Sequence, residues 1–173
     1  MFHEFKEYQP TLVRIEPGAE FQDKGKTYQL QQKLGEGGWG SVYQALDKQT
    51  GMTRAIKFMS LGMRAYKGME ERFEREVAVP GQFSSPFILN SIDRIEIDTP
   101  DGKRIGFVTE FLKGKNLRTE LDVHRVGDVL GILEPELACE YIAEVALALA
   151  EMSEKGFAHR DLKPDNISFR RNV

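Results

Sequence analysis

The sequence predicts an α+β fold, in which a small antiparallel sheet with one helix is followed by a helical region. Strand-like patterns follow one another closely between residues 28 and 59, with glycines at the turns. Apolar residues then recur with a helical period over residues 65–79, and again over residues 135–155. The pattern changes at about residue 113, which separates the part of the chain rich in strands from the helical part.

Five strands are expected in the sheet. Residues 28–34 lead into a glycine cluster, residues 41–46 continue out of it, and a turn carries the chain into residues 53–59. Further along, residues 88–98 and 104–112 form a hairpin pattern. The sequence PDGK joins them, and its residues favour a tight turn.

Two helices are expected from their apolar faces. In residues 65–79, Met69, Phe73 and Val77 are spaced by four and lie on one side. The segment 135–155 has a proline in its first turn and a glycine at its end, as helix termini prefer. We predict that one stripe of this helix belongs to the core: Leu137, Tyr141, Val145 and Leu149.

The domain boundaries follow from these elements. Residues 1–26 are mixed and polar with several breakers, so we interpret them as an extension that either packs on the domain or hangs free of it. Residues 27–112 form the part with the sheet, and residues 113–173 form the start of the helical part.

The composition excludes several classes of protein. The 173 residues are 40 % hydrophobic and 29 % charged, which suits a globular chain with a core. A net charge of −3 gives no basis for nucleic-acid binding. The single cysteine, Cys139, favours a reducing cytoplasm over a disulfide framework. No apolar run reaches the length of a membrane span, so no membrane partner is expected for this chain.

Residues 35–40 read GEGGWG, the spacing G-x-G-x-x-G. A dinucleotide-binding fold would need a helix directly after this motif, whereas residues 41–46 have a strand pattern. Between two strands, Gly35, Gly37 and Gly40 would let backbone N–H groups approach phosphates without interference from Cβ atoms. The alternative is a flexible hairpin tip that happens to be rich in glycine.

Lys57 lies in the strand pattern of residues 53–59. Alternation places it on the same face as Ala55, so the two side chains face inward or outward together. A lysine that faces inward needs an anionic partner, and Glu76 is the glutamate on the apolar face of the predicted helix 65–79. The alternative is an ordinary exposed lysine.

Residues 159–166 read HRDLKPDN and bring three kinds of chemistry onto one short loop. Asp161 is a potential base, Lys163 a cation and Asn166 an oxygen ligand for a metal. The alternatives are a surface ion pair of Arg160 with Asp161, which would contribute little stability, and a histidine that serves the core.

With four motifs in this order, the chain resembles the eukaryotic-like (Hanks-type) serine/threonine protein kinases, and most closely their bacterial members. The resemblance runs from about residue 28 to residue 167. It implies a protein-kinase-like fold, with an N-lobe sheet and the beginning of a C-lobe. It also implies transfer of the γ-phosphoryl group of ATP, with Mg²⁺, to a Ser or Thr hydroxyl of a protein substrate.

The resemblance also implies roles for particular residues. Lys57, held by Glu76, would contact the α- and β-phosphates, Thr109 would be the gatekeeper, and Asn116 would lie near the ribose. The remaining nucleotide contacts would come from the glycine loop, the two following strands and the segment after the sheet: Gly35, Gly37, Gly40, Val42, Ala55, Glu110 and Leu112.

The same resemblance assigns the transfer step to the loop at residues 159–166. Asp161 would accept or orient the proton of the substrate hydroxyl, and Lys163 would steady the γ-phosphoryl group as it moves. Asn166 would hold Mg²⁺.

The family pattern continues after Asn166 with an Asp-Phe-Gly motif and further helices, which the sequence does not contain. We therefore expect a kinase truncated after its catalytic loop. The apolar stripe at residues 137–149 would then lack packing partners, which predicts self-association or a partner chain. The alternative function is a truncated pseudokinase that binds a nucleotide or a partner without transferring phosphate.

Overall fold

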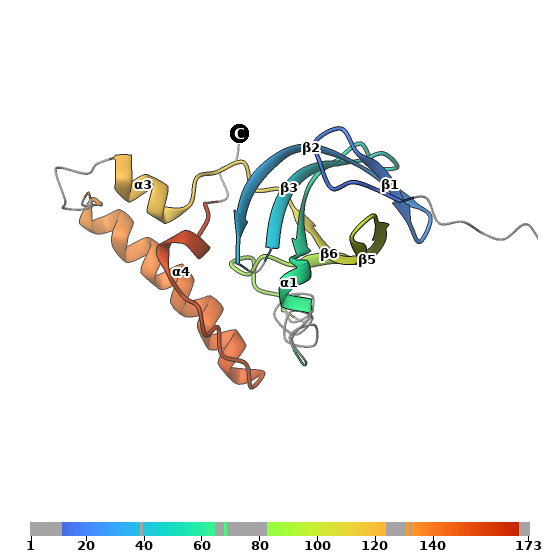
Figure 1. The fold of residues 1–173 in the computed structure, drawn as a ribbon. Coiled ribbons are helices and arrows are strands. Elements are labelled where there is room, and N and C mark those ends of the chain that lie inside the picture. The colour runs from blue at the N-terminus through green and yellow to red at the C-terminus, as the bar shows by residue number, and fades with distance from the viewer. Residues whose placement is uncertain are drawn as a thin grey trace, which may run out of the picture. The chain divides into compact units, whose positions relative to one another are not determined.

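The computed structural model describes residues 12–38, 40–64, 68, 83–123, 131 and 133–169 (Figure 1). Of the helix expected at 65–79, the structure describes only Gly68, which lies in a turn with a φ of 85°. The rest of that helix, with Glu76, lies outside the described residues. The contacts divide the chain into two compact units. The first comprises the described residues up to 78 together with residues 91–110, and the second comprises residues 83–90 and the described residues from 111 onward.

A single antiparallel sheet forms the first unit, with the strand order β1-β2-β3-β4-β6-β5. Its strands are β1 Glu20–Asp23, β2 Lys26–Gly37, β3 Gly40–Asp47, β4 Thr53–Met59, β5 Ser91–Thr99 and β6 Gly102–Glu110. The described residues of this unit also include one helical turn, α1 Leu61–Arg64. The sheet thus has six strands in place of the five expected.

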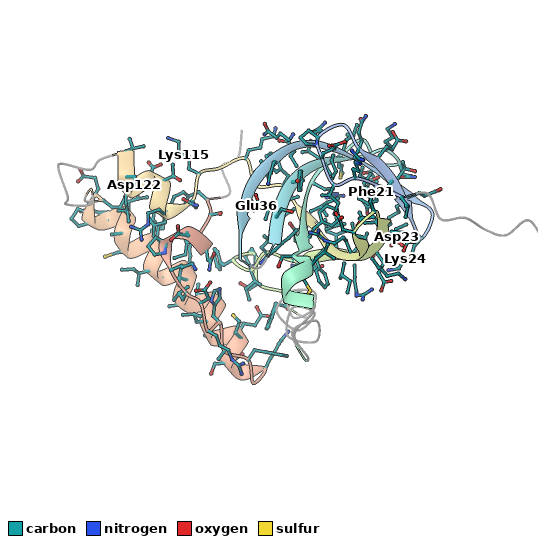
Figure 2. All side chains as sticks on the ribbon, in the orientation of Figure 1. Phe21, Asp23, Lys24, Glu36, Lys115 and Asp122 are labelled. Carbon is teal, nitrogen blue, oxygen red and sulfur yellow. The ribbon has the colours of Figure 1, made fainter. Side chains whose placement is uncertain are left out.

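The additional strand, β1, comes from residues that the sequence assigned to an extension. A two-residue turn joins it to β2, with Asp23 opposite Lys26. Both turn residues, Lys24 and Gly25, have positive φ angles, 47° and 79°. This is the backbone that twisted two-residue hairpins prefer, and glycine adopts it more readily than lysine. Phe21 of β1 is buried, which explains why the strand stays on the sheet (Figure 2).

The segment before β1 joins the two edges of the sheet. The Val13 N–H donates to the Asp98 carbonyl of β5 over 2.8 Å, and β1 also contacts β5. The Tyr43 hydroxyl of β3 donates to the carbonyl of Ile15 over 3.1 Å. The strands therefore curl around a shared interior, as the arched ribbon in Figure 1 shows.

The core of this unit lies on the inner face of the curled sheet. Its aromatic rings meet at Phe58, whose ring centroid lies 6.0 Å from that of Phe21 and 6.1 Å from that of Tyr43, both edge to face. The buried side chains around these rings come from the other five strands, β2 to β6: Tyr28, Leu30, Ala45, Ile56, Ile95, Ile97 and Val108. Successive side chains of a strand point to opposite faces, so the other face is left for the residues between them.

The second unit contains α3 Leu117–Val123, α4 Pro135–Glu154 and the 3₁₀ turn η2 Pro164–Asn166. Two segments far apart in sequence meet in it. Leu117 N–H donates to the Ile167 carbonyl over 2.8 Å, and Phe169 N–H donates to the Lys115 carbonyl over 3.2 Å. Gly114 makes this approach possible, because an added Cβ would lie 2.0 Å from the Phe169 carbonyl oxygen.

Helix α4 has the ends that its sequence predicts. Pro135 is its first residue, and Gly156 follows its end with a φ of 78°, a conformation that suits glycine. The prediction that its stripe is core is wrong, because no residue of α4 is buried in the structure. Leu137 of the stripe is exposed and its other three members are half-buried. Outside the stripe, Ile142 and Leu147 are 69 % and 58 % exposed. No helix among the described residues is long and apolar enough to cross a membrane.

Candidate functional site

The glycine motif forms the tip of the β2–β3 hairpin, where Gly35 lies opposite Val42 and Gly37 opposite Gly40. Strand β3 follows the motif directly, so the strand–loop–strand expectation is confirmed and the dinucleotide-binding alternative is excluded. An added Cβ at Gly35 or Gly37 would meet no atom within 4 Å. The backbone of this loop is therefore open to an approaching group.

Gly40 is different, because it fixes the loop against β4. Its φ is 145°, and an added Cβ would lie 1.9 Å from the Phe58 carbonyl oxygen. The Ser60 hydroxyl donates to the Gly38 carbonyl over 3.0 Å, which ties the loop to the end of β4. Glu36 projects from the loop end of β2 (Figure 2) and forms an ion pair with Lys33 across 2.5 Å.

Four residues predicted for nucleotide binding gather on the face of the sheet opposite the core. Lys57 of β4 lies directly between Val42 of β3 and Phe107 of β6. Side chains of directly opposed residues share a face, and Ala55 is in turn opposed by Thr109. The next residues along β4, Ile56 and Phe58, are fully buried in the core. The face therefore presents Val42, Ala55, Lys57 and Thr109 together, and all four are half-buried.

The chain leaves this face at the end of β6. The Thr109 hydroxyl donates to the carbonyl of Glu110 over 3.1 Å, which directs this hydroxyl along the backbone of the strand end. Leu112, the other residue expected to offer backbone groups, is half-buried just after β6, in the second unit.

Asn116 has a structural role that the sequence did not predict, because it caps helix α3. Its Oδ1 accepts hydrogen bonds from the Thr119 N–H over 2.8 Å and from the Thr119 hydroxyl over 2.7 Å. Its Nδ2 donates to the Asp165 carbonyl over 3.4 Å. Asn is a preferred residue just before a helix, because its side-chain oxygen can accept a backbone N–H of the first turn. The role near the ribose stays a prediction.

The backbone turns sharply at Arg160, within the loop that carries the candidate catalytic residues. Arg160 has a φ of 61°, and the Asp161 N–H donates to the His159 carbonyl two residues earlier over 2.8 Å. Non-glycine residues with positive φ are strained, and such strain concentrates at functional sites. The turn leaves the Asp161 side chain 65 % exposed.

Asp161, Lys163 and Asn166 meet around one carboxylate. The Lys163 ammonium lies 3.0 Å from Asp161 Oδ2. Asn166 Nδ2 donates to the same oxygen over 2.9 Å and to the Asp161 carbonyl over 2.7 Å. The hydrogen bond from Lys163, and after it the one from Asn166, lowers the pKa of Asp161 below its ordinary value. The carboxylate is therefore ionised at neutral pH and can accept a hydrogen bond from a hydroxyl group.

Asn166 has the chemistry expected of a magnesium ligand. Its Nδ2 is used by Asp161, which leaves Oδ1 for a cation, and Mg²⁺ prefers oxygen ligands. Among the described residues, no group of three or more His, Cys, Asp or Glu side chains is placed to hold a metal. Magnesium at nucleotide sites takes few protein ligands and several phosphate oxygens, so this arrangement fits a metal that arrives with phosphate.

A family model described as the protein kinase domain matches residues 28–172. The chain is 32 % identical over 149 residues to the probable serine/threonine-protein kinase PknB of Bifidobacterium longum. It is also 32 % identical over 142 residues to the serine/threonine-protein kinase pkn2 of Myxococcus xanthus. These alignments cover 83 % and 81 % of this chain, but 21 % and 16 % of the two relatives.

Among solved structures, the chain is similar to the PknI kinase domain of Mycobacterium tuberculosis. The TM-score is 0.67 at 25 % sequence identity, over 82 % of this chain and 54 % of the other. The chain thus spans about half of that kinase domain, and a smaller share of the curated relatives.

Proposed function

We propose that this chain, which belongs to the protein kinase family and resembles its bacterial Hanks-type serine/threonine members, transfers the γ-phosphoryl group of ATP to a protein hydroxyl. The observation that carries this proposal is the cluster of Asp161, Lys163 and Asn166 around one ionised carboxylate. Phosphoryl transfer asks a protein mainly to position groups and to neutralise charge, and these three side chains are suited to both.

The proposed nucleotide site in the first unit consists of the open glycine loop and the face that carries Lys57. The N–H groups at Gly35 and Gly37 would approach the phosphates, and Val42 with Ala55 would pack on the base. Lys57 would bring a positive charge to the α- and β-phosphates. The expected partner of this lysine, Glu76, is part of the same proposal, as are Thr109 and Glu110 toward the adenosine. Leu112 and Asn116, which belong to the second unit, keep their expected adenosine contacts as part of the proposal.

In the transfer step, the Asp161 carboxylate would accept the hydrogen bond of the attacking Ser or Thr hydroxyl and orient its oxygen. The bond from that oxygen to the γ-phosphorus forms while the bond to the departing ADP oxygen breaks, and the hydroxyl proton passes to the Asp161 carboxylate. The Lys163 ammonium would stabilise the charge on the transferred group. Asn166 Oδ1 would hold Mg²⁺, which when bound neutralises charge on the phosphates.

Exposed apolar side chains on α4 support a proposal about partners. Ile142 and Leu147 are 69 % and 58 % exposed, and no residue of this helix is buried. We infer that α4 packs against a second copy of the chain or against another chain, which would cover these side chains. We also propose a cytoplasmic location, because a single cysteine gives no disulfide framework of the kind that suits oxidising compartments.

Intact-mass analysis after incubation with ATP and Mg²⁺ tests the proposed transfer. The wild-type chain should gain whole phosphates, while Asp161→Asn should gain none, because it loses the acceptor for the hydroxyl proton. No gain in either protein would contradict transfer by this chain, and would favour the alternative of a truncated pseudokinase that binds a nucleotide or a partner without transferring phosphate.

A further inference from the structure

The carboxylate of Glu151, near the end of α4, accepts hydrogen bonds from residues 84 and 85 with both of its oxygens. Oε1 accepts a hydrogen bond from the Ser84 N–H over 2.8 Å, and Oε2 accepts one from the Ser85 N–H over 2.8 Å. The Lys155 ammonium lies 3.2 Å from Oε1. We call this arrangement of Glu151, Ser84 and Ser85 the Glu151 clamp. Hydrogen bonds to a charged group are stronger than neutral ones, so the clamp is a firm attachment.

Packing around the clamp fixes the same segment. Phe83 is buried, and its ring meets that of Phe157 edge to face, with 5.7 Å between centroids. The Lys155 ammonium also lies 5.1 Å from the centre of the Phe83 ring. Hydrogen bonds, from Ser84 first and then from Lys155 and Ser85, lower the pKa of Glu151 despite desolvation. The carboxylate is therefore charged at neutral pH.

The two serines of the clamp differ in what their hydroxyls do. The Ser84 hydroxyl belongs to an exposed residue and donates to Glu151 Oε1 over 3.3 Å. The Ser85 hydroxyl belongs to a half-buried residue and accepts the Phe87 N–H over 3.2 Å. Ser84 thus combines access to solvent with direct contact to the charged group that holds the segment.

We propose that Ser84 is a phosphorylation site, and that a phosphoryl group on its Oγ opens the Glu151 clamp. The donor would be ATP acting through a serine/threonine kinase, the chemistry of the proposed function. The Ser84 Oγ–phosphorus bond forms, the bond from that phosphorus to ADP breaks with its electron pair left on the ADP oxygen, and the hydroxyl proton passes to the catalytic carboxylate of the modifying kinase. The proposal depends on the proposed function only for this source of phosphate, which a second kinase can supply.

Electrostatics explains why the clamp would open. A phosphoserine carries a charge of about −1.5 to −2 at neutral pH, and the Ser84 Oγ lies in contact with the Glu151 carboxylate. Before modification, the Glu151 charge is balanced by that of Lys155. Afterwards the phosphate repels Glu151 and competes for Lys155. Along the chain, the released segment is followed by β5, which begins at Ser91.

Hydrogen exchange of the full chain with phosphoserine encoded at position 84 tests the opening. The amides of residues 84 and 85 should exchange about tenfold faster or more, since two charge-assisted hydrogen bonds are lost. Ser84→Ala should stay protected, because both backbone bonds to Glu151 remain. In the Glu151→Gln background the phosphate should cause a smaller increase. Unchanged exchange with phosphoserine, or an equal increase in both backgrounds, would overturn the mechanism.

Phosphate mapping tests whether Ser84 is an acceptor. The chain carrying Asp161→Asn, which should not modify itself, is incubated with ATP, Mg²⁺ and an active bacterial serine/threonine kinase domain. Phosphate is expected on Ser84 and not on the adjacent Ser85. A map in which Ser84 stays unmodified would overturn the assignment, whether or not other hydroxyls carry phosphate. Because the added enzyme supplies the activity, this result is independent of transfer by the chain itself.

Discussion

Gly40 carries more structural constraint than the other glycines of its loop. Replacement by alanine would place a Cβ at 1.9 Å from the Phe58 carbonyl oxygen, in a backbone conformation with φ of 145°. We expect Gly40→Ala to lower the free energy of unfolding by about 1–3 kcal/mol from backbone strain alone, and to weaken ATP binding. Gly37→Ala is the matched control, since its Cβ meets no atom within 4 Å. Thermal unfolding of both variants checks this, and equal melting temperatures would contradict it.

At the scale of residues, local chemistry was easier to predict than contacts over long distances. Asp161, Lys163 and Asn166 lie within six positions of one another, so their spacing was enough to predict that they meet, and the structure brings them together. The hydrogen bond from the Ser84 N–H to Glu151, by contrast, joins residues 67 positions apart. No periodicity or motif in one sequence encodes such a pair. The role of Asn116 as a cap is a local one, because its Oδ1 accepts the N–H of Thr119 three residues later, and Asn is a preferred residue before a helix.

Asp47 organises the turn between β3 and β4. Its Oδ1 accepts the Gln49 N–H over 3.0 Å and the Thr50 N–H over 3.3 Å, and the residue is 5 % exposed. Burial raises the pKa of Asp47, but hydrogen bonds from Thr50 and Gln49 outweigh it, so the pKa lies below the ordinary value of 3.8. Because the folded state holds the ionised form, this stability is present above pH 3.8 and is lost as pH falls through the lower pKa of the folded protein.

Asp47→Asn should therefore lower the free energy of unfolding by about 1–2 kcal/mol at neutral pH. Its difference from the wild type should shrink as the pH falls below that ordinary value. Urea unfolding of both proteins across this range measures the effect. Asp101→Asn, at an exposed position in the β5–β6 turn, serves as the control. A deficit that stays constant with pH would show that the charge of Asp47 has no part in the turn.

At the scale of elements, long periodic segments were predicted well and short ones were not. β4 has the bounds expected from its sequence, and α4 differs from its expected range by one residue at its end. β1 was missed because its four residues are too few for a pattern, and because Lys24 takes a positive φ that is unusual for lysine. Its place in the sheet depends on Phe21 entering the core and on Val13 reaching β5, which are tertiary contacts.

The fold as a whole leaves apolar side chains of α4 exposed, Ile142 most of all. Ile142→Glu should weaken self-association, because it places a charge in the proposed contact. It should change the free energy of unfolding by less than about 0.5 kcal/mol, since the residue is 69 % exposed. Sedimentation velocity over a range of concentrations measures the association. A wild-type chain that is monomeric throughout, or a variant that associates equally, would contradict the proposed contact.

Tyr141→Ala provides the contrast on the same helix. The ring of Tyr141 packs against that of Phe169 with 4.5 Å between centroids, so its loss should destabilise the second unit without removing the exposed apolar face. The earlier prediction that this helix is core arose because an apolar stripe indicates that a face will be covered. It does not indicate which chain covers it.

The most direct test of the account is the affinity of the purified chain for ATP with Mg²⁺, measured by calorimetric titration. Wild type and Asp161→Asn should bind with similar affinity, because Asp161 is proposed to act on the substrate hydroxyl. Lys57→Met should bind about tenfold more weakly or worse, through loss of a charged contact to phosphate. Lys48→Met, which removes an exposed lysine paired with Glu20, should bind like the wild type. Equal affinity for wild type and Lys57→Met, or no binding by any of the proteins, would contradict a nucleotide site on this face of the sheet.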